Sequence, residues 1–345
     1  MQSTRFGACA AWPTPDGARP LRREKPSFVE RFRLYWRRFP GPVLWAGRLH
    51  CLATLNMAVR VEWFRRVGGF DERFAAAGED LNLTYRLVRA RAPCLVDDAW
   101  YTRHDLRDSV PGLVRRNLRY AYGAGAHERL TGDLGTAAPN FRAALRRAAV
   151  PLTKRAPDGT PPRGADPPRP GRVERLLFAL LESWIAFAWT RAQARGFRDA
   201  PAGSAPPRTA RTAAVPAPRP AAPTAAGTPK PRVTVVFTQR EYFSMTRPAL
   251  ETLFRNTGPP FRLVVVDGAA PPALRDELEA EAARRNFELV RAEHFLSPQA
   301  ARRLGLARVD TEFVAFLEND TLVEPGWLEA LLRCADETGA AAVGP

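Results

Sequence analysis

The chain has 345 residues, of which 45% are hydrophobic and 10% aromatic, and these values exclude a wholly disordered protein. Its formal net charge of +16 favours anionic partners such as nucleotides, nucleic acids or lipid headgroups. Almost all of the basic residues are arginines spread along the chain, however, so the charge by itself indicates little about function. Four widely spaced cysteines, with no Cys-x-x-Cys pair, argue against a zinc knuckle or a disulfide framework.

The apolar segments do not indicate export or a membrane span. The N-terminal residues lack the charged head and apolar core of a signal peptide. The longest apolar stretch, residues 176–189, is too short to cross a bilayer and contains Glu182. We therefore expect a cytoplasmic protein, and a contact with the inner face of the membrane stays an open alternative.

Residues 1–127 combine apolar periodicity with acidic motifs and are predicted to fold. The helix expected at 78–90 begins with Glu79 and Asp80, which suit the positive end of a helix dipole. In chain order, the pattern predicts a strand, a short helix, this longer helix, a second strand and a basic helix, over residues 51–59, 61–67, 78–90, 94–96 and 110–127.

The middle of the chain, residues 128–232, is dominated by Ala, Pro, Arg and Thr. One long helix is predicted at 173–195, and it is apolar around most of its circumference. Such a helix has to pack into protein or lie along a membrane surface, and docking on protein is the favoured alternative. Residues 198–232 cannot supply a core and are predicted to form a disordered linker.

Residues 233–345 alternate short strands with amphipathic helices, which is typical of a parallel sheet with helices on its faces. Ligands of such sheets bind beyond the carboxyl ends of the strands, where Thr238, Asp267 and the segment 318–320 fall. The strands are expected at 233–238, 261–267, 287–290 and 312–317, and the helices at 247–256, 272–285 and 298–308.

The run from Glu318 to Trp327, Glu-Asn-Asp-Thr-Leu-Val-Glu-Pro-Gly-Trp, resembles the Asp-x-Asp segment of family-2 glycosyltransferases, which have the GT-A fold. The resemblance implies that Asp320 and Glu318 hold a divalent metal, Mn²⁺ or Mg²⁺, on the diphosphate of a nucleotide-sugar. A hard cation held by oxygens would neutralise the charge that grows on this leaving group. The resemblance also implies nucleotide-binding roles for Asp267 and Arg302, and Thr238 and Arg240 are expected to contact the nucleotide from the end of the first strand.

The first zone resembles a later part of the same family, its acceptor half, in the segments 56–60, 67–71 and 78–86. By this resemblance Asp80, with Glu79 beside it, is the general base that takes a proton from the acceptor hydroxyl. His104 falls where the family often has a histidine that completes the metal or phosphate contacts. Each of these residues also has a purely structural alternative: a solvated acid pair, a charge pair at a helix start, or a packed histidine.

The two halves therefore stand in the reverse of the family's order, with the acceptor half first and the nucleotide half last. We expect an α/β protein, a GT-A (Rossmann-like) mixed sheet with helices on both faces, present as two partial domains joined by a helix and a disordered linker. A piece of a tandem protein would explain the order, and docking of the halves into one composite site is left open. The expected parts are an acceptor half, a helical extension, a linker and a truncated nucleotide half, at 1–127, 128–197, 198–232 and 233–345.

The function that these resemblances imply is metal-assisted transfer of a sugar from a UDP-, GDP- or dTDP-sugar to a carbohydrate or lipid-linked acceptor. The segment 116–120 only faintly resembles the signature of processive members, so a non-processive enzyme is expected, and the family resemblance implies an inverting one. Two alternatives remain: a basic protein that binds nucleic acid or an anionic surface, and an inactive fragment of a tandem glycosyltransferase. Nucleic acid is disfavoured because the arginines are spread and the linker has almost no aromatic residues.

Overall fold

The structure is a computed structural model, and it describes most of the two zones that were predicted to fold. The described residues are 28–36, 43–45, 48–52, 56–74, 77–96, 102–104, 109–132, parts of 142–149, 170–200, 231–239 and 243–344. The chain divides into two compact units: 42–75, 79–105 and 205–345 form the sheet unit, and 1–41, 76–78 and 106–204 form the helical unit.

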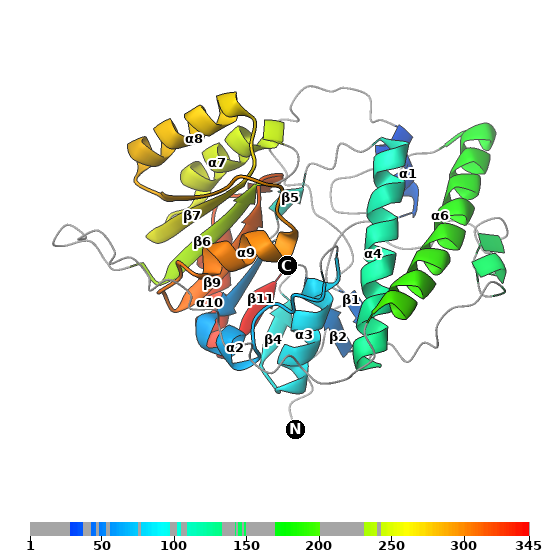
Figure 1. The fold of residues 1–345 in the computed structure, drawn as a ribbon, viewed down its shortest axis with the longest axis horizontal. Coiled ribbons are helices and arrows are strands. Elements are labelled where there is room, and N and C mark those ends of the chain that lie inside the picture. Colours follow the sequence, from blue (N-terminus) through cyan, green and yellow to red (C-terminus); the bar gives the residue numbers. More distant parts are fainter. Residues whose placement is uncertain are drawn as a thin grey trace. The chain divides into compact units, whose positions relative to one another are not determined.

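A seven-stranded mixed sheet is the centre of the sheet unit (Figure 1). Its strand order is β4, β11, β3, β9, β6, β7, β8, with bounds Cys94–Val96, Ala342–Gly344, Asn56–Arg60, Phe313–Glu318, Val233–Gln239, Phe261–Gly268 and Glu288–Ala292. Strands β9, β6, β7 and β8 are parallel neighbours, as the alternation of strands and helices predicted. All seven residues of β6 are buried, which is why large apolar residues stand at consecutive positions, 235–237, instead of alternating with exposed ones.

The two halves of the sequence meet in this sheet. Strand β3, from the first zone, pairs antiparallel with β9 through five residue pairs and with β11 on its other side. Strand β4 then pairs parallel with β11. The two partial domains are therefore not separate bodies, because β3 satisfies backbone groups that would otherwise stay unpaired along the edges of β9 and β11. The predicted mixed α/β sheet is therefore present, and it is a joint product of both segments.

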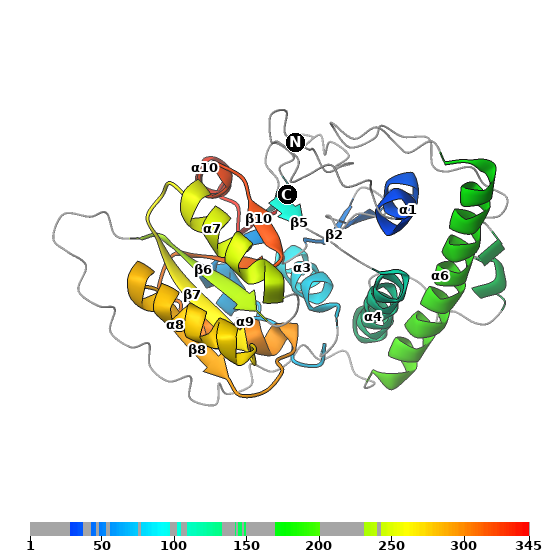
Figure 2. The ribbon, with the colours of Figure 1, turned by 90° about the horizontal axis from the view of Figure 1, so that it is seen from above.

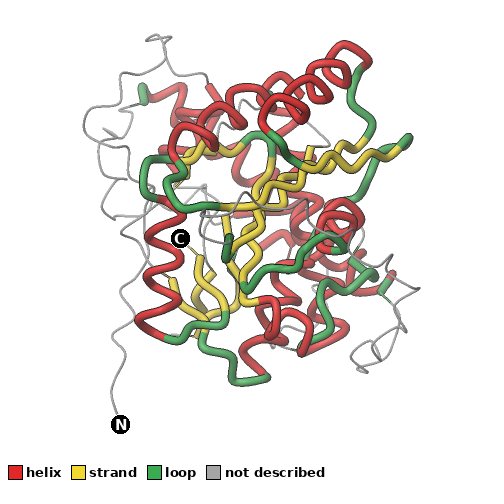
Figure 3. The backbone as a smooth tube through the Cα atoms, turned by 90° about the vertical axis from the view of Figure 1, so that its left-hand side faces the viewer, coloured by secondary structure: helices red, strands yellow, loops and turns green. Residues whose placement is uncertain are grey.

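Helices cover both faces of the sheet, whose strands are drawn in yellow in Figure 3. One face packs against the helices α7, α8 and α10, with bounds Thr246–Asn256, Pro272–Arg285 and Trp327–Thr338. The other face packs against α2, α3 and α9, with bounds Val61–Arg66, Glu79–Arg89 and Pro298–Leu306. Each face has its own apolar core, so the sheet is buried on both sides, as a largely parallel sheet requires.

Short elements complete the sheet unit. Strands β1 and β2, Val43–Trp45 and Arg48–Cys51, form an antiparallel pair, and β10 pairs antiparallel with β5, Thr321–Val323 with Thr102–His104. A 3-10 turn, η1, spans Phe243–Met245 ahead of α7. The second of these pairs is important for the site, because it again joins a strand of the first zone to one of the last zone.

The helical unit consists of α1, α4 and α6, with bounds Phe28–Trp36, Val110–Thr131 and Arg172–Asp199 (Figure 2). Helices α4 and α6 approach so closely that a Cβ on Gly125 would lie 1.9 Å from the backbone oxygen of Gln193. A Cβ on Gly196 would lie 2.0 Å from the backbone oxygen of Tyr122. Glycine is therefore required at both crossing points. The basic helix predicted with the acceptor half, α4, thus belongs to this unit and not to the sheet unit.

No helix among the described residues is long and apolar enough to cross a membrane. The arginines of the sheet unit are largely engaged with acids. Arg232, for example, lies 2.9 Å from both Glu312 and Asp336, and Arg60 also reaches Glu312. Among the described residues of this unit, much of the positive charge is therefore balanced by nearby acids.

Candidate functional site

The guanidinium of Arg302 joins the two halves of the site. Its Nη1 lies 2.6 Å from Oε1 of Glu79, at the start of α3, and its Nη2 lies 2.7 Å from Oε1 of Glu318, at the end of β9. The Arg302 side chain is only 3% exposed, so these are buried, charge-assisted hydrogen bonds. One side chain therefore ties the acidic pair of the first zone to the strand tip of the last zone.

The position of Arg302 follows from how α9 packs. Gly305, one turn later on the same helix, lies directly on β6, where an added Cβ would stand 2.3 Å from Cγ1 of Val236. The absence of a side chain lets α9 lie close to the sheet and brings Arg302 to the strand ends. Phe70 lies against the guanidinium, with its ring centroid 5.6 Å away. The resemblance implied a phosphate contact for Arg302, whereas here its two nitrogens are engaged with carboxylates.

Asp80 is the acid of this cluster that is poised to exchange a proton near neutral pH. Burial, and after it the charge of Glu79, raise the pKa of Asp80 to about 7, while Arg302 acts in the opposite direction. Its Oδ1 accepts a hydrogen bond of 2.8 Å from the backbone N–H of Leu81 in the first turn of α3. Glu79 and Asp80 thus differ in what they contact, because Glu79 is ion-paired with Arg302.

Cys51 is a neighbour of this acid in the structure. Its thiol is buried, and burial, together with the charges of Asp80 and Glu79, raises the pKa of Cys51 well above its usual value. Strand β2, which carries Cys51, is held against α3 by a 2.9 Å hydrogen bond from the Leu52 N–H to Oγ1 of Thr84. Only the proximity of β2 to α3 reveals this residue, and no motif in the sequence marks it.

The tip of β9 presents the other acids. Glu318 ends the strand with about a fifth of its side chain exposed, and Asp320 follows in the turn with 4% exposed. The intervening Asn319 turns inward and donates from Nδ2 to Oγ1 of Thr246, at 3.1 Å. In the register of β5 and β10 the backbone of His104 stands opposite Thr321, next to Asp320. Its side chain lies outside the described part of the structure.

The residues expected to bind the nucleotide are deeply buried. Thr238 is 2% exposed, and its hydroxyl donates to the backbone oxygen of Leu317. Asp267 is fully buried, and its Oδ1 accepts from the Ala270 N–H at 2.9 Å and from Nε2 of Gln239 at 3.2 Å. Thr238 thus joins the carboxyl ends of β6 and β9, and Asp267 joins those of β7 and β6. Arg240, the other predicted contact, lies outside the described residues.

The loop that leads into α3 is fixed by a second arginine. Arg86 donates to the backbone oxygens of Val67 and Gly69, each at 2.5 Å, and to Oδ1 of Asn82 at 2.8 Å. Gly69 has a φ of +67°, a conformation that glycine adopts without strain. These bonds explain why the Val-Gly-Gly-Phe-Asp and Glu-Asp segments of the sequence act as one structural element, with Phe70 delivered to Arg302.

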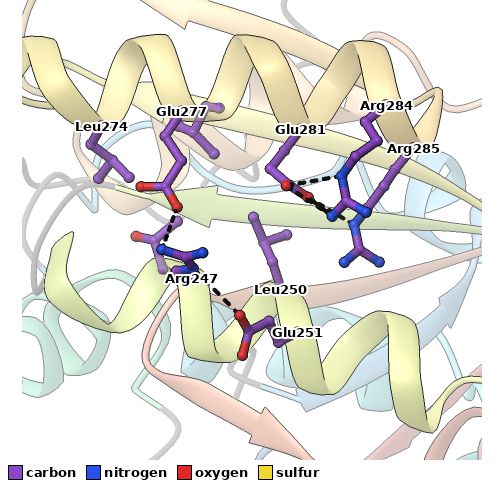
Figure 4. Close-up of a pocket in the computed structure, with 10 residues that line it drawn as sticks. Arg247, Leu250, Glu251, Leu274, Glu277, Glu281, Arg284 and Arg285 are labelled. Carbon is purple, nitrogen blue, oxygen red and sulfur yellow. Dashed lines mark hydrogen bonds and ion pairs between the residues drawn. The ribbon is translucent and has the colours of Figure 1, made fainter.

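A shallow pocket lies between α7 and α8 (Figure 4). Its charged side chains pair with one another: Arg247 lies 3.4 Å from both Glu251 and Glu277, and Glu281 lies 2.7 Å from Arg284. None of the strand-tip acids lines it. This pocket is therefore not the site that the acids form.

In the part of the chain that the structure describes, no group of three His, Cys, Asp or Glu side chains is arranged to hold a metal ion. Two carboxylates, Glu318 and Asp320, remain as candidate ligands at one strand tip. Magnesium commonly binds proteins through one or two carboxylates, together with waters and substrate phosphates, so this donor set fits a cation that arrives with a diphosphate.

Comparison with known proteins agrees with the geometry. Residues 233–345 match the family described as Glycosyl transferase family 2. The pre-mycofactocin glycosyltransferases of two Mycobacterium tuberculosis strains, CDC 1551 / Oshkosh and ATCC 25618 / H37Rv, are each 40% identical over 83 residues, 24% of this chain. The chain spans only 17% of the length of these curated relatives. A crystal structure of S. aureus TarS 1–349 aligns at 20% identity and a TM-score of 0.28, over 31% of this chain and 33% of that one.

Proposed function

Because residues 233–345 belong to glycosyltransferase family 2, we propose that this chain transfers a sugar from a nucleotide-sugar donor to an acceptor hydroxyl. The observation that carries the proposal is the double ion pair of Arg302. It brings an acidic helix start from the first zone to the strand tip of the family segment, at 2.6 and 2.7 Å. A base and a diphosphate-binding tip are both needed for this reaction, and each is supplied by a different segment of the chain.

Asp80 is the general base of the proposed reaction. As the acceptor oxygen attacks the anomeric carbon, its hydroxyl proton passes to the Asp80 carboxylate, the new C–O bond forms, and the bond to the diphosphate oxygen breaks. A base is most effective when its pKa lies near the working pH, and the pKa of Asp80 is raised to about 7. A single displacement of this kind inverts the anomeric configuration, and we propose a non-processive enzyme.

Asp320 and Glu318 are the residues that would hold a divalent cation, Mn²⁺ or Mg²⁺. When bound, such a cation neutralises charge on the leaving diphosphate. Glu318 has one oxygen engaged with Arg302, so Asp320 is the leading ligand, and His104 stays a proposed third one on the basis of its backbone position. Arg302 keeps Glu318 oriented at the tip, and the Phe70 ring lies against its guanidinium.

Nucleotide recognition is proposed at the carboxyl ends of β6 and β7. Thr238 and Asp267 would act there by shaping the strand ends, and Arg240 would act from the segment that follows β6. The donor is proposed to be a UDP-, GDP- or dTDP-sugar, and the acceptor a carbohydrate or lipid-linked hydroxyl. The curated relatives are named as pre-mycofactocin glycosyltransferases, which supports a nucleotide-sugar donor as a class.

The test is isothermal titration of the full chain with UDP, GDP and dTDP, each with and without Mn²⁺. We expect metal-dependent binding of one diphosphate, loss of that binding in Asp320→Asn, and retention of it in Asp80→Asn. Release of nucleotide from the matching donor, in the presence of a panel of acceptors, should then require Asp80. Metal-independent binding would refute the role of the strand tip, and full transfer by Asp80→Asn would refute the base.

A further inference from the structure

The outer face of α6 carries an apolar stripe that continues into a row of arginines. Five large side chains, Val173, Leu176, Leu177, Leu180 and Trp184, are between 48% and 74% exposed. At 100° per residue they fall within an arc of about 100°, so they form one continuous strip along the first half of the helix. This strip is defined here as the apolar stripe of α6.

The opposite face of α6 is the one that packs into the helical unit. Phe178 and Ile185 are buried in a small core, together with α1 and the start of α4. Phe178 makes an edge contact with Phe32, with ring centroids 5.6 Å apart. The sequence left two destinations open for this apolar helix, protein or a membrane surface. One face of α6 packs on protein, and the apolar stripe is exposed and could lie on a membrane surface.

The second half of the same face is basic. Arg191, Arg195 and Arg198 are all exposed, and the helical period places them in line with the apolar stripe. Arg195 lies 3.3 Å from Asp199, whereas the other two carry no acid at i+4. Along one face, then, α6 presents three apolar turns followed by two turns of positive charge.

We propose that this face docks α6 on a membrane surface that contains anionic lipid. Side chains of the apolar stripe would enter the boundary between headgroups and acyl chains, and the arginines would lie over anionic headgroups. Exposed apolar side chains and adjacent positive charge act together in helices that bind membrane surfaces without crossing them. This inference concerns location and is independent of the transfer reaction proposed above.

A second copy of the chain is a poorer occupant of the same face. If two α6 helices paired in parallel, the arginine rows would face each other and repel. If they paired antiparallel, each arginine row would lie over the apolar stripe of its partner, where the guanidinium groups would lose water without gaining acids. An anionic bilayer matches both halves of the face in one orientation, and a second copy matches neither.

The experiment is co-sedimentation of the full chain with vesicles of phosphatidylcholine alone, or of phosphatidylcholine with 30 mol% phosphatidylglycerol. We expect binding to the anionic vesicles, weakened by raising salt. Arg191→Gln/Arg198→Gln should weaken binding by about 30-fold, on the usual contribution of a basic residue near an anionic surface. Leu176→Gln/Leu180→Gln should weaken it by at least about tenfold, in low and high salt alike.

Matched controls are available in the sheet unit. Arg247→Gln/Arg333→Gln removes the same charge from exposed positions, and Phe295→Gln removes an exposed aromatic ring. We expect these controls to bind vesicles like the parent chain. All the replaced side chains are exposed, and circular dichroism of each variant verifies folding. Equal loss in the controls, no binding of the parent to anionic vesicles, or a stripe-dependent dimer by light scattering would each overturn the proposal.

Discussion

Replacing Asp80 with Asn should stabilise the folded protein, and by more at alkaline than at acidic pH. The carboxyl group of Asp80 has an ordinary pKa of 3.8, and burial beside Glu79 raises the pKa to about 7. An acid whose pKa is higher in the folded state is destabilising when ionised. The penalty is absent below pH 3.8, grows as the pH rises toward 7, and is complete above 7.

The magnitude follows from the size of the shift. At about 1.4 kcal/mol per pKa unit, three units amount to a penalty of about 4 kcal/mol at pH 8. At pH 5 only the first part of the penalty is present, about 2 kcal/mol. The neutral amide of Asn removes it at both values, so Asp80→Asn should gain about 2 to 3 kcal/mol more at pH 8 than at pH 5.

The assay is urea-induced unfolding of parent and variant at the two pH values, followed by circular dichroism. Asp336→Asn is the matched control, because hydrogen bonds from Arg232 lower the pKa of Asp336 and make its ionised form stabilising. That control should show no gain at pH 8. A gain for Asp80→Asn that is equal at both pH values, or a loss at pH 8, would refute the claim that a buried, repelled carboxylate stands at this position. It would also remove the main physical argument for Asp80 as base.

Three further predictions follow from other contacts. Arg302→Gln should destabilise the fold by about 3–5 kcal/mol, because it breaks a buried ion pair. It should also move the acid limb of the pH–rate profile to higher pH, because Arg302 lowers the pKa of Asp80, and an unmoved profile would contradict this. Gly125→Ala should lower the free energy of unfolding, measured with denaturant, by about 1–3 kcal/mol, because its Cβ would meet the α6 backbone at 1.9 Å. In the control Gly171→Ala, the Cβ would meet nothing within 4 Å, and the loss should be less than about 1 kcal/mol. Cys51 should resist iodoacetamide at pH 8 in the native protein, since its raised pKa keeps it as the thiol, and mass spectrometry before and after denaturation measures this.

The family segment was predictable because its signals are local. The short apolar run at 233–238 predicts an interior strand, and the acids at 318–320 follow a second strand of the same kind. The glycine pair 68–69 follows the end of α2, and both glycines have a positive φ. In these cases the period of the apolar residues, or the φ that glycine allows, decided the local structure.

The joining of the segments could not be predicted in the same way. Strand β3 has the pattern of a buried strand, but alternation does not reveal which partner a strand will choose. Arg302 shows the same limit, because its position in a family motif suggested a phosphate contact, while its ion-pair partner Glu79 lies 223 residues away. Long-range pairing depends on which acid the fold brings to a buried guanidinium, and a single sequence does not carry that information.

The insertion of β3 has a consequence for how the protein is made. Arg60, at the end of β3, bonds Glu312, which is synthesised 252 residues later. At typical elongation rates of about 5–20 residues per second, an apolar strand waits for roughly 10 to 50 seconds before its neighbour leaves the ribosome. The sheet can therefore close only after β9 and β11 have been synthesised, and until then both edges of β3 lack their strand partners.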